Sequence, residues 1–131
     1  MSEKRTIEWF LRLSLSAGYF SDVADRFGVW PKRMSTWGNW NNFIDYTHTL
    51  MPFLTREMAN IAGLVATLIE IFLAVLLLTN YRTSIFARIS GCLLLTFGIC
   101  MAVFINIKAP LDYSVFIAAA ASFALAALHR R

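Results

Sequence analysis

Long apolar segments separated by short polar ones dominate the pattern of this chain. The clearest of them, residues 60–79, carries a single charged side chain, Glu70. About twenty apolar residues in a helix span the ~30 Å hydrocarbon core of a bilayer. Similar segments recur along the chain. The pattern therefore predicts an all-α membrane protein, a four-transmembrane-helix bundle with spans at about 7–27, 58–79, 84–107 and 112–128.

The segment between the first two spans, residues 28–55, has a different pattern. From Trp40 to Leu54 the larger side chains recur at helical spacing, with polar residues between them. This spacing predicts an amphipathic helical insert over 40–51, at the outer ends of the bundle and closed by Pro52. Thr55 is expected to cap the second span, and Asp112 the last one.

Composition agrees with a membrane protein of one domain, residues 1–131. Hydrophobic residues make up 58% of the chain and charged residues only 15%, whereas a soluble domain carries about 25% charged residues. The net charge is +4, and we attribute it to topology and lipid head groups rather than to nucleic acid, because six basic residues lie near predicted span ends. They are Lys4, Arg5, Arg82, Arg88, Arg130 and Arg131. Their side of the membrane is slightly the more basic, which places both termini in the cytoplasm.

A basic residue, Arg12, lies inside the first predicted span, and an acidic residue, Glu70, lies inside the second. Each lies roughly 8–15 Å from the cytoplasmic end of its helix at 1.5 Å per residue, so we expect them to face each other. Thr67 is one turn from Glu70 and can donate to it. Two interpretations stay open: a polar pocket for a quinone-like head group or a proton relay, and a structural ion pair that fixes helix register.

A second group of polar residues is expected at the outer mouth of the bundle. Its members are Asp22, Asp25, Arg26, His48, Lys108, Asp112 and Tyr113. Asp22 and Arg26 are spaced to pair on one helix face. The group predicts a small polar cavity beneath the insert, although solvated or capping roles also account for His48, Asp112 and Lys108.

Metal sites and soluble-type active sites are weakly supported. The two histidines, His48 and His129, fall on opposite sides of the membrane in this topology. Cys92 and Cys100 lie on one helix about 12 Å apart along its axis, too far for a disulfide. We expect no metal and no built-in cofactor, and the sequence leaves open whether the chain takes part in catalysis.

Three short stretches and one acidic residue carry a family resemblance. Residues 24–30 (ADRFGVW), residues 37–40 (WGNW), residues 108–116 (KAPLDYSVF) and Glu70 in the second span are the positions concerned. They resemble one subgroup of the DoxX family of small four-helix proteins of the bacterial inner membrane, whose membrane acid Glu70 matches. Asn106 and Thr55 stand where that pattern has glycine and proline. The resemblance implies the fold and the location. It also marks as candidate ligand-binding positions Arg12, Asp25, Arg26, Glu70, Lys108, Asp112 and Tyr113.

The functional expectation follows from this resemblance. Some members of the family are the small membrane subunit of thiosulfate:quinone oxidoreductase, so we expect a subunit or accessory factor of a quinone-linked redox process, with a redox protein as partner. Nothing in the chain matches a thiosulfate-oxidising centre. One alternative is a non-catalytic scaffold that binds an envelope or redox partner through Trp40 and Phe43. Another is a small-solute or lipid transporter, which would work as an oligomer.

Overall fold

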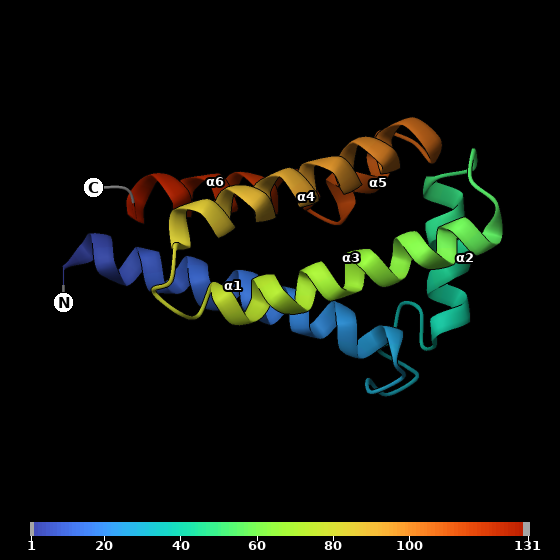
Figure 1. Ribbon diagram of the computed structural model, residues 1–131, viewed down its shortest axis with the longest axis horizontal. Helices are drawn as coiled ribbons and strands as arrows, with labels where there is room; N and C mark the ends of the chain where they lie inside the picture. The colour runs from blue at the N-terminus through green and yellow to red at the C-terminus, as the bar shows by residue number, and fades with distance from the viewer. Residues whose placement is uncertain (1, 130–131) are drawn as a thin grey trace.

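The computed structural model describes residues 2–129, and this range contains six helices and no strand. Four helices run along the long axis (Figure 1): α1 (Glu3–Arg26), α3 (Arg56–Leu76), α4 (Thr83–Phe104) and α6 (Val115–His129). α2 (Trp40–Leu50) crosses one end of this group, and α5 (Lys108–Asp112) is a short connector. α1 packs mainly on α3, and α4 packs mainly on α6. The predicted all-helical fold is confirmed.

Capping side chains begin several helices where the sequence places them. Asn39 Oδ1 accepts a hydrogen bond from the Asn42 N–H at 2.8 Å and begins α2, the predicted amphipathic insert. Thr55 Oγ1 accepts from the Met58 N–H at 3.2 Å and begins α3. Each cap satisfies one of the N–H groups that have no partner inside a helix. The helix expected within the insert is confirmed, although it ends at Leu50 rather than 51, and the Thr55 cap is confirmed.

The boundaries around residues 105–114 differ from those expected. α4 ends at Phe104 rather than 107, because Asn106 Oδ1 accepts from the Ala109 N–H at 2.9 Å and begins the α5 turn. Asp112 does not cap the last helix. It ends α5 and accepts from Lys108 Nζ at 2.5 Å. Ser114 adopts a left-handed backbone with φ 57°, which redirects the chain before α6 starts.

Small residues bring α4 and α6 together. Gly91 and Gly98 of α4 leave space for the rings of Phe123 and Phe116, which a Cβ atom at either glycine would meet within 2.7 Å. On α6 the alanines Ala119 and Ala126 are buried. Close backbone approach of this kind is how helices associate where water supplies no driving force. The alanine-rich α6 therefore serves the packing role expected of it.

Apolar side chains also cover much of the outside of the molecule. α3 and α4 are long and apolar enough to cross a membrane by length and composition, and α6 is a shorter apolar helix. Large apolar side chains point outward from all four long helices, among them Phe10 (70% exposed), Phe72 (66%), Val103 (66%) and Ile117 (69%). A surface of this kind on a water-soluble monomer would be unusual.

α2 packs against α3 at Gly63. A Cβ atom at Gly63 would lie 2.7 Å from Ile44 Cδ1 and 3.1 Å from Phe43 Cε2, and both side chains are buried. Relative to Gly18→Ala, Gly63→Ala is expected to lower the free energy of unfolding by ~1–3 kcal/mol, the usual cost of overpacking. Gly18 is a matched control, because it is also helical and a Cβ atom there meets nothing within 4 Å. Thermal unfolding in detergent measures the difference, and equal melting temperatures would contradict the tight α2–α3 contact.

Candidate functional site

Glu70 forms a buried ion pair with Arg26, the last residue of α1. Arg26 Nη1 donates to the Glu70 carboxylate and, at 2.8 Å, to Thr67 Oγ1. The side chains of Arg26 and Glu70 are only 3% and 2% exposed. Thr67 in turn donates to the Gly63 carbonyl at 2.8 Å. The carboxylate thus has a cation and a hydrogen-bond donor beside it, as a buried charge requires, whereas Arg26 Nε is buried and makes no hydrogen bond to the described residues.

The expected pairing of Arg12 with Glu70 is wrong. The axial offset between α1 and α3 differs from the expected one. Arg12 lies level with Leu77, the C-cap of α3, and with Thr79 in the turn after it, and not with Glu70. The expected pairing of Arg26 with Asp22 is also replaced, because Arg26 turns toward α3 instead of along its own helix.

The insert covers the ion pair with aromatic rings. The guanidinium carbon of Arg26 lies 4.0 Å from the centre of the Phe43 ring and 5.2 Å from the Trp37 ring. Phe43 is buried and faces inward, so its predicted role in partner docking is wrong. Trp40 is half-buried, stacks on Phe27, and donates from Nε1 to Asn60 Oδ1 at 2.8 Å. The amphipathic face of α2 thus closes the helix group.

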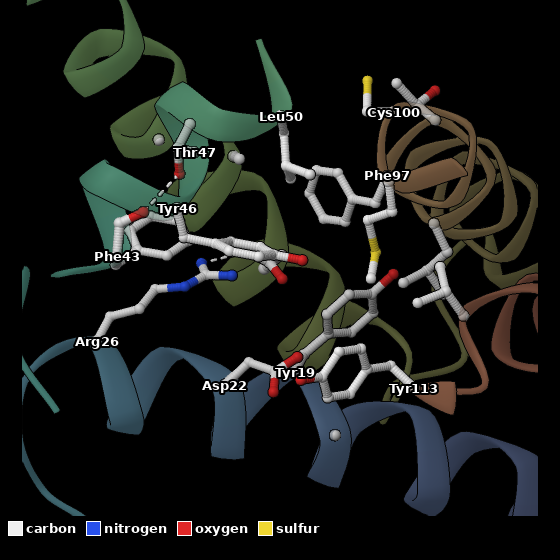
Figure 2. A pocket seen from close by; sticks show the side chains of 18 of the residues that line it. Tyr19, Asp22, Arg26, Phe43, Tyr46, Thr47, Leu50, Phe97, Cys100 and Tyr113 are labelled. Carbon is white, nitrogen blue, oxygen red and sulfur yellow. Dashed lines mark hydrogen bonds and ion pairs between the residues drawn. The ribbon is translucent and has the colours of Figure 1, made fainter. Parts of the chain in front are cut away.

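A cavity of about 430 Å³ lies beside the ion pair, between α1, α2, α3, α4 and the start of α6. Figure 2 shows aromatic side chains and a few polar ones pointing into it. The aromatic wall consists of Tyr19, Trp37, Phe43, Tyr46, Phe97 and Tyr113, and the charged groups on it are Asp22, Arg26 and Glu70. Within residues 2–129, both hydrogen bonds of the Arg26 guanidinium leave from Nη1. Its other terminal nitrogen, Nη2, therefore remains for an acceptor on a ligand.

Hydroxyl groups extend the polar wall across the bundle. Tyr19 Oη lies 2.6 Å from Ser90 Oγ, which lies 2.8 Å from Ser122 Oγ, so the chain of hydroxyls joins α1, α4 and α6. On the insert, burial raises the pKa of Tyr46, and the negative charge that Tyr113 can carry adds to the effect. The Tyr46 hydroxyl therefore stays protonated at neutral pH and can donate to a ligand.

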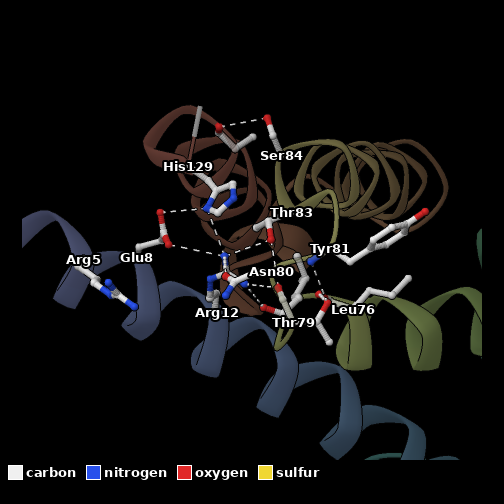
Figure 3. Close-up of polar contacts among 12 residues, drawn as sticks. Arg5, Glu8, Arg12, Leu76, Thr79, Asn80, Tyr81, Thr83, Ser84 and His129 are labelled. Atoms are coloured by element: carbon white, nitrogen blue, oxygen red, sulfur yellow. Dashed lines mark hydrogen bonds and ion pairs between the residues drawn. The ribbon is translucent and has the colours of Figure 1, made fainter. Parts of the chain in front are cut away.

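Arg12 belongs to a separate polar cluster at the opposite end of the molecule (Figure 3). It donates to the carbonyls of Leu77 at 2.8 Å and Thr79 at 2.5 Å, and to Thr83 Oγ1 at 3.0 Å. Further contacts are with Asn80, His129 and Glu8. A cation at a helix C-terminus is favoured by the helix dipole. Arg12 therefore joins α1 to the α3–α4 turn and lies outside the cavity.

The remaining predicted site residues divide between structural roles and the cavity rim. Asp25 is buried and accepts from the N–H groups of Thr36 and Trp37 at 2.8 and 3.0 Å, and of Gly38 at 3.3 Å, which fixes the loop after α1. Lys108 and Asp112 pair with each other on the surface. Tyr113 is largely exposed but reaches the cavity. His48 bonds to the Leu54 carbonyl at 2.9 Å.

Sequence reasoning missed Tyr19, Tyr46 and the serine hydroxyls. A signal for Tyr19 was present, because Arg12, Tyr19 and Arg26 recur every seven residues and so share one face of α1. Nothing in the local sequence marks Tyr46, whose position depends on how the insert folds back. Within residues 2–129 no group of three or more His, Cys, Asp or Glu side chains is arranged to hold a metal ion.

Comparison with protein-family models, with curated proteins and with solved structures finds no match for this chain.

The ion pair is expected to show strong coupling in a double-mutant cycle. Glu70→Leu leaves the Arg26 charge buried without a counter-charge, which costs ~3–5 kcal/mol of unfolding free energy. Arg26→Met with Glu70→Leu removes both charges, so the double variant should be more stable than the sum of the single effects allows. Chemical unfolding in detergent measures all four proteins.

The exposed pair of Lys108 and Asp112 is the control for this cycle. Its side chains are 78% and 53% exposed, and the same cycle there should give ~0–1 kcal/mol. Additive effects at Arg26 and Glu70 would mean that the two charges do not depend on each other.

Proposed function

We propose that this chain is an integral membrane protein of the DoxX type in the bacterial inner membrane. In this proposal α1, α3, α4 and α6 are the four spans, α2 lies at the outer surface and both chain ends are cytoplasmic. The length and apolar character of α3 and α4 support it, as do the apolar side chains on the outside of all four helices. Burial of both charged side chains of the interior pair, Arg26 and Glu70, also agrees with an apolar surrounding.

We further propose that the cavity binds the head group of a quinone, and that the protein is a subunit or accessory factor of a quinone-linked redox process. The observation that carries this proposal is the cavity itself. Its volume of about 430 Å³ lies within the ~300–1,000 Å³ range of small-molecule sites. Aromatic rings on its wall can stack on a flat ring, and Arg26 can donate to a carbonyl oxygen.

A scaffold role is the second candidate, and one exposed loop favours it. Between α1 and α2 the chain presents Phe27, Val29 and Met34 to the outside, at 60%, 73% and 59% exposure, next to Lys32 and Arg33. This loop, rather than Trp40 and Phe43, is the surface that a partner protein would contact.

The test is the quinone content of protein purified into nanodiscs from quinone-containing membranes. Wild-type protein is expected to carry near-stoichiometric quinone above an unrelated four-span control. Gly18→Leu should lower that content severalfold, because Gly18 lines the cavity and a side chain there extends into open space.

Ala17→Leu is the matched control, since Ala17 is exposed on the same helix and does not line the cavity. It should retain the wild-type quinone content. If the quinone content of the wild-type protein is no higher than that of the unrelated protein, the quinone proposal is refuted. The scaffold role is then the better-supported function.

A further inference from the structure

A second hollow lies between α3 and α4, on the side of the molecule where these two helices face outward. It is a shallow groove of about 450 Å³. Its lining consists of Ile69 from α3 and, from α4, Ile85, Arg88, Ile89, Cys92, Leu93 and Thr96. α3 and α4 pack on each other less than α3 packs on α1 or α4 on α6. The groove is therefore a gap in the wall of the helix group.

The groove and the cavity have one lining residue in common, Thr96, so the two hollows lie next to each other at this side chain. Thr96 lines both hollows, whereas the neighbouring Phe97 lines only the cavity and Leu93 only the groove. Thr96 Oγ1 donates to the Cys92 carbonyl at 2.8 Å, on its own helix. Because the Thr96 hydroxyl already donates within its own helix, no unpaired donor of Thr96 faces an apolar ligand at this position.

The shape and chemistry of the groove fit a linear hydrocarbon chain. From Thr96 to Arg88 it follows α4 for about 12 Å at 1.5 Å per residue. Isoleucine and leucine side chains form most of its lining and no aromatic ring contributes to it, in contrast to the cavity. At the far end Arg88 can line the groove with its alkyl stem while its charged head reaches the membrane boundary.

We propose that the ligand of the cavity carries a linear apolar tail, which leaves the cavity at Thr96 and lies in the groove between α3 and α4. This inference rests on the proposed function, since it presumes that a head group occupies the cavity. It adds that the ligand is a long-tailed amphiphile and that it enters from the bilayer side. A head group without a tail would fill the cavity only.

The experiment compares two probes that share one head group: dimethoxy-methyl-benzoquinone alone, and the same ring with a decyl chain. Each is titrated into nanodiscs that contain wild-type protein, Cys92→Trp or Ile99→Trp. Cys92→Trp fills the groove, whereas Ile99 is exposed on the same helix and lines neither hollow. Because Ile99→Trp is measured in the same bilayer, it corrects for partition of the decyl probe into lipid.

Wild-type protein and Ile99→Trp are expected to bind the decyl probe at least ~10-fold more tightly than the ring alone, equivalent to about 1.4 kcal/mol. Cys92→Trp should remove this advantage and leave the affinity for the ring unchanged. Ring binding with no gain from the decyl chain overturns the inference and leaves the proposed function standing. Binding of neither probe overturns both.

Alkylation of the native Cys92 in wild-type protein gives a second readout, independent of any variant. Cys92 is an exposed free thiol in the groove. The decyl probe should slow its reaction with a maleimide severalfold, and the ring alone should not. Equal alkylation rates with the two probes contradict a tail in the groove. Equal rates are also the result expected if an anionic lipid, held by Arg88, occupies the groove instead of the tail.

Discussion

A carboxylate inside an apolar helix is the constraint on which this structure depends. Glu70 cannot remain charged there without a cation and hydrogen-bond donors, and Arg26 supplies the cation from the end of α1. The side chain of Arg26 is long enough to reach α3, and the ring of Phe43 covers its guanidinium group. The position of the insert against the helix group is therefore tied to the neutralisation of one buried charge.

The two buried arginines hold α1 at both ends by different chemistry. Arg26 meets a carboxylate, whereas Arg12 donates to the carbonyl of Leu77, the C-cap of α3, and to the carbonyl of Thr79 in the turn that follows. Fourteen residues separate them, about 21 Å along the helix. Two such contacts on one face fix both the rotation and the axial position of α1 against α3. This arrangement leaves the middle of α1 available to line the cavity.

The cavity exists because small residues face the insert where large ones would fill the space. Gly18 of α1 and Ala62 and Ala66 of α3 contribute little side-chain volume to its wall, and α2 crosses the end of the helix group that holds it (Figure 1). The groove has another origin, because α3 and α4 pack on each other less than on α1 and α6. The cavity has a largely aromatic wall and the groove a largely aliphatic one, and Thr96 lines both.

The sequence by itself determined the helices, because apolar periodicity and capping residues act locally: α2, the start of α3 with its cap Thr55, and the close packing of α6 were all predictable. It also identified Arg26 and Glu70 as candidate site residues. Only the tertiary structure decided which charge meets which, since this depends on the axial offset between α1 and α3, set by contacts far apart in sequence. The same holds for Phe43 facing inward and for Tyr19 and Tyr46 lining one cavity. Such positions follow from the packing of whole helices, and no local pattern encodes them.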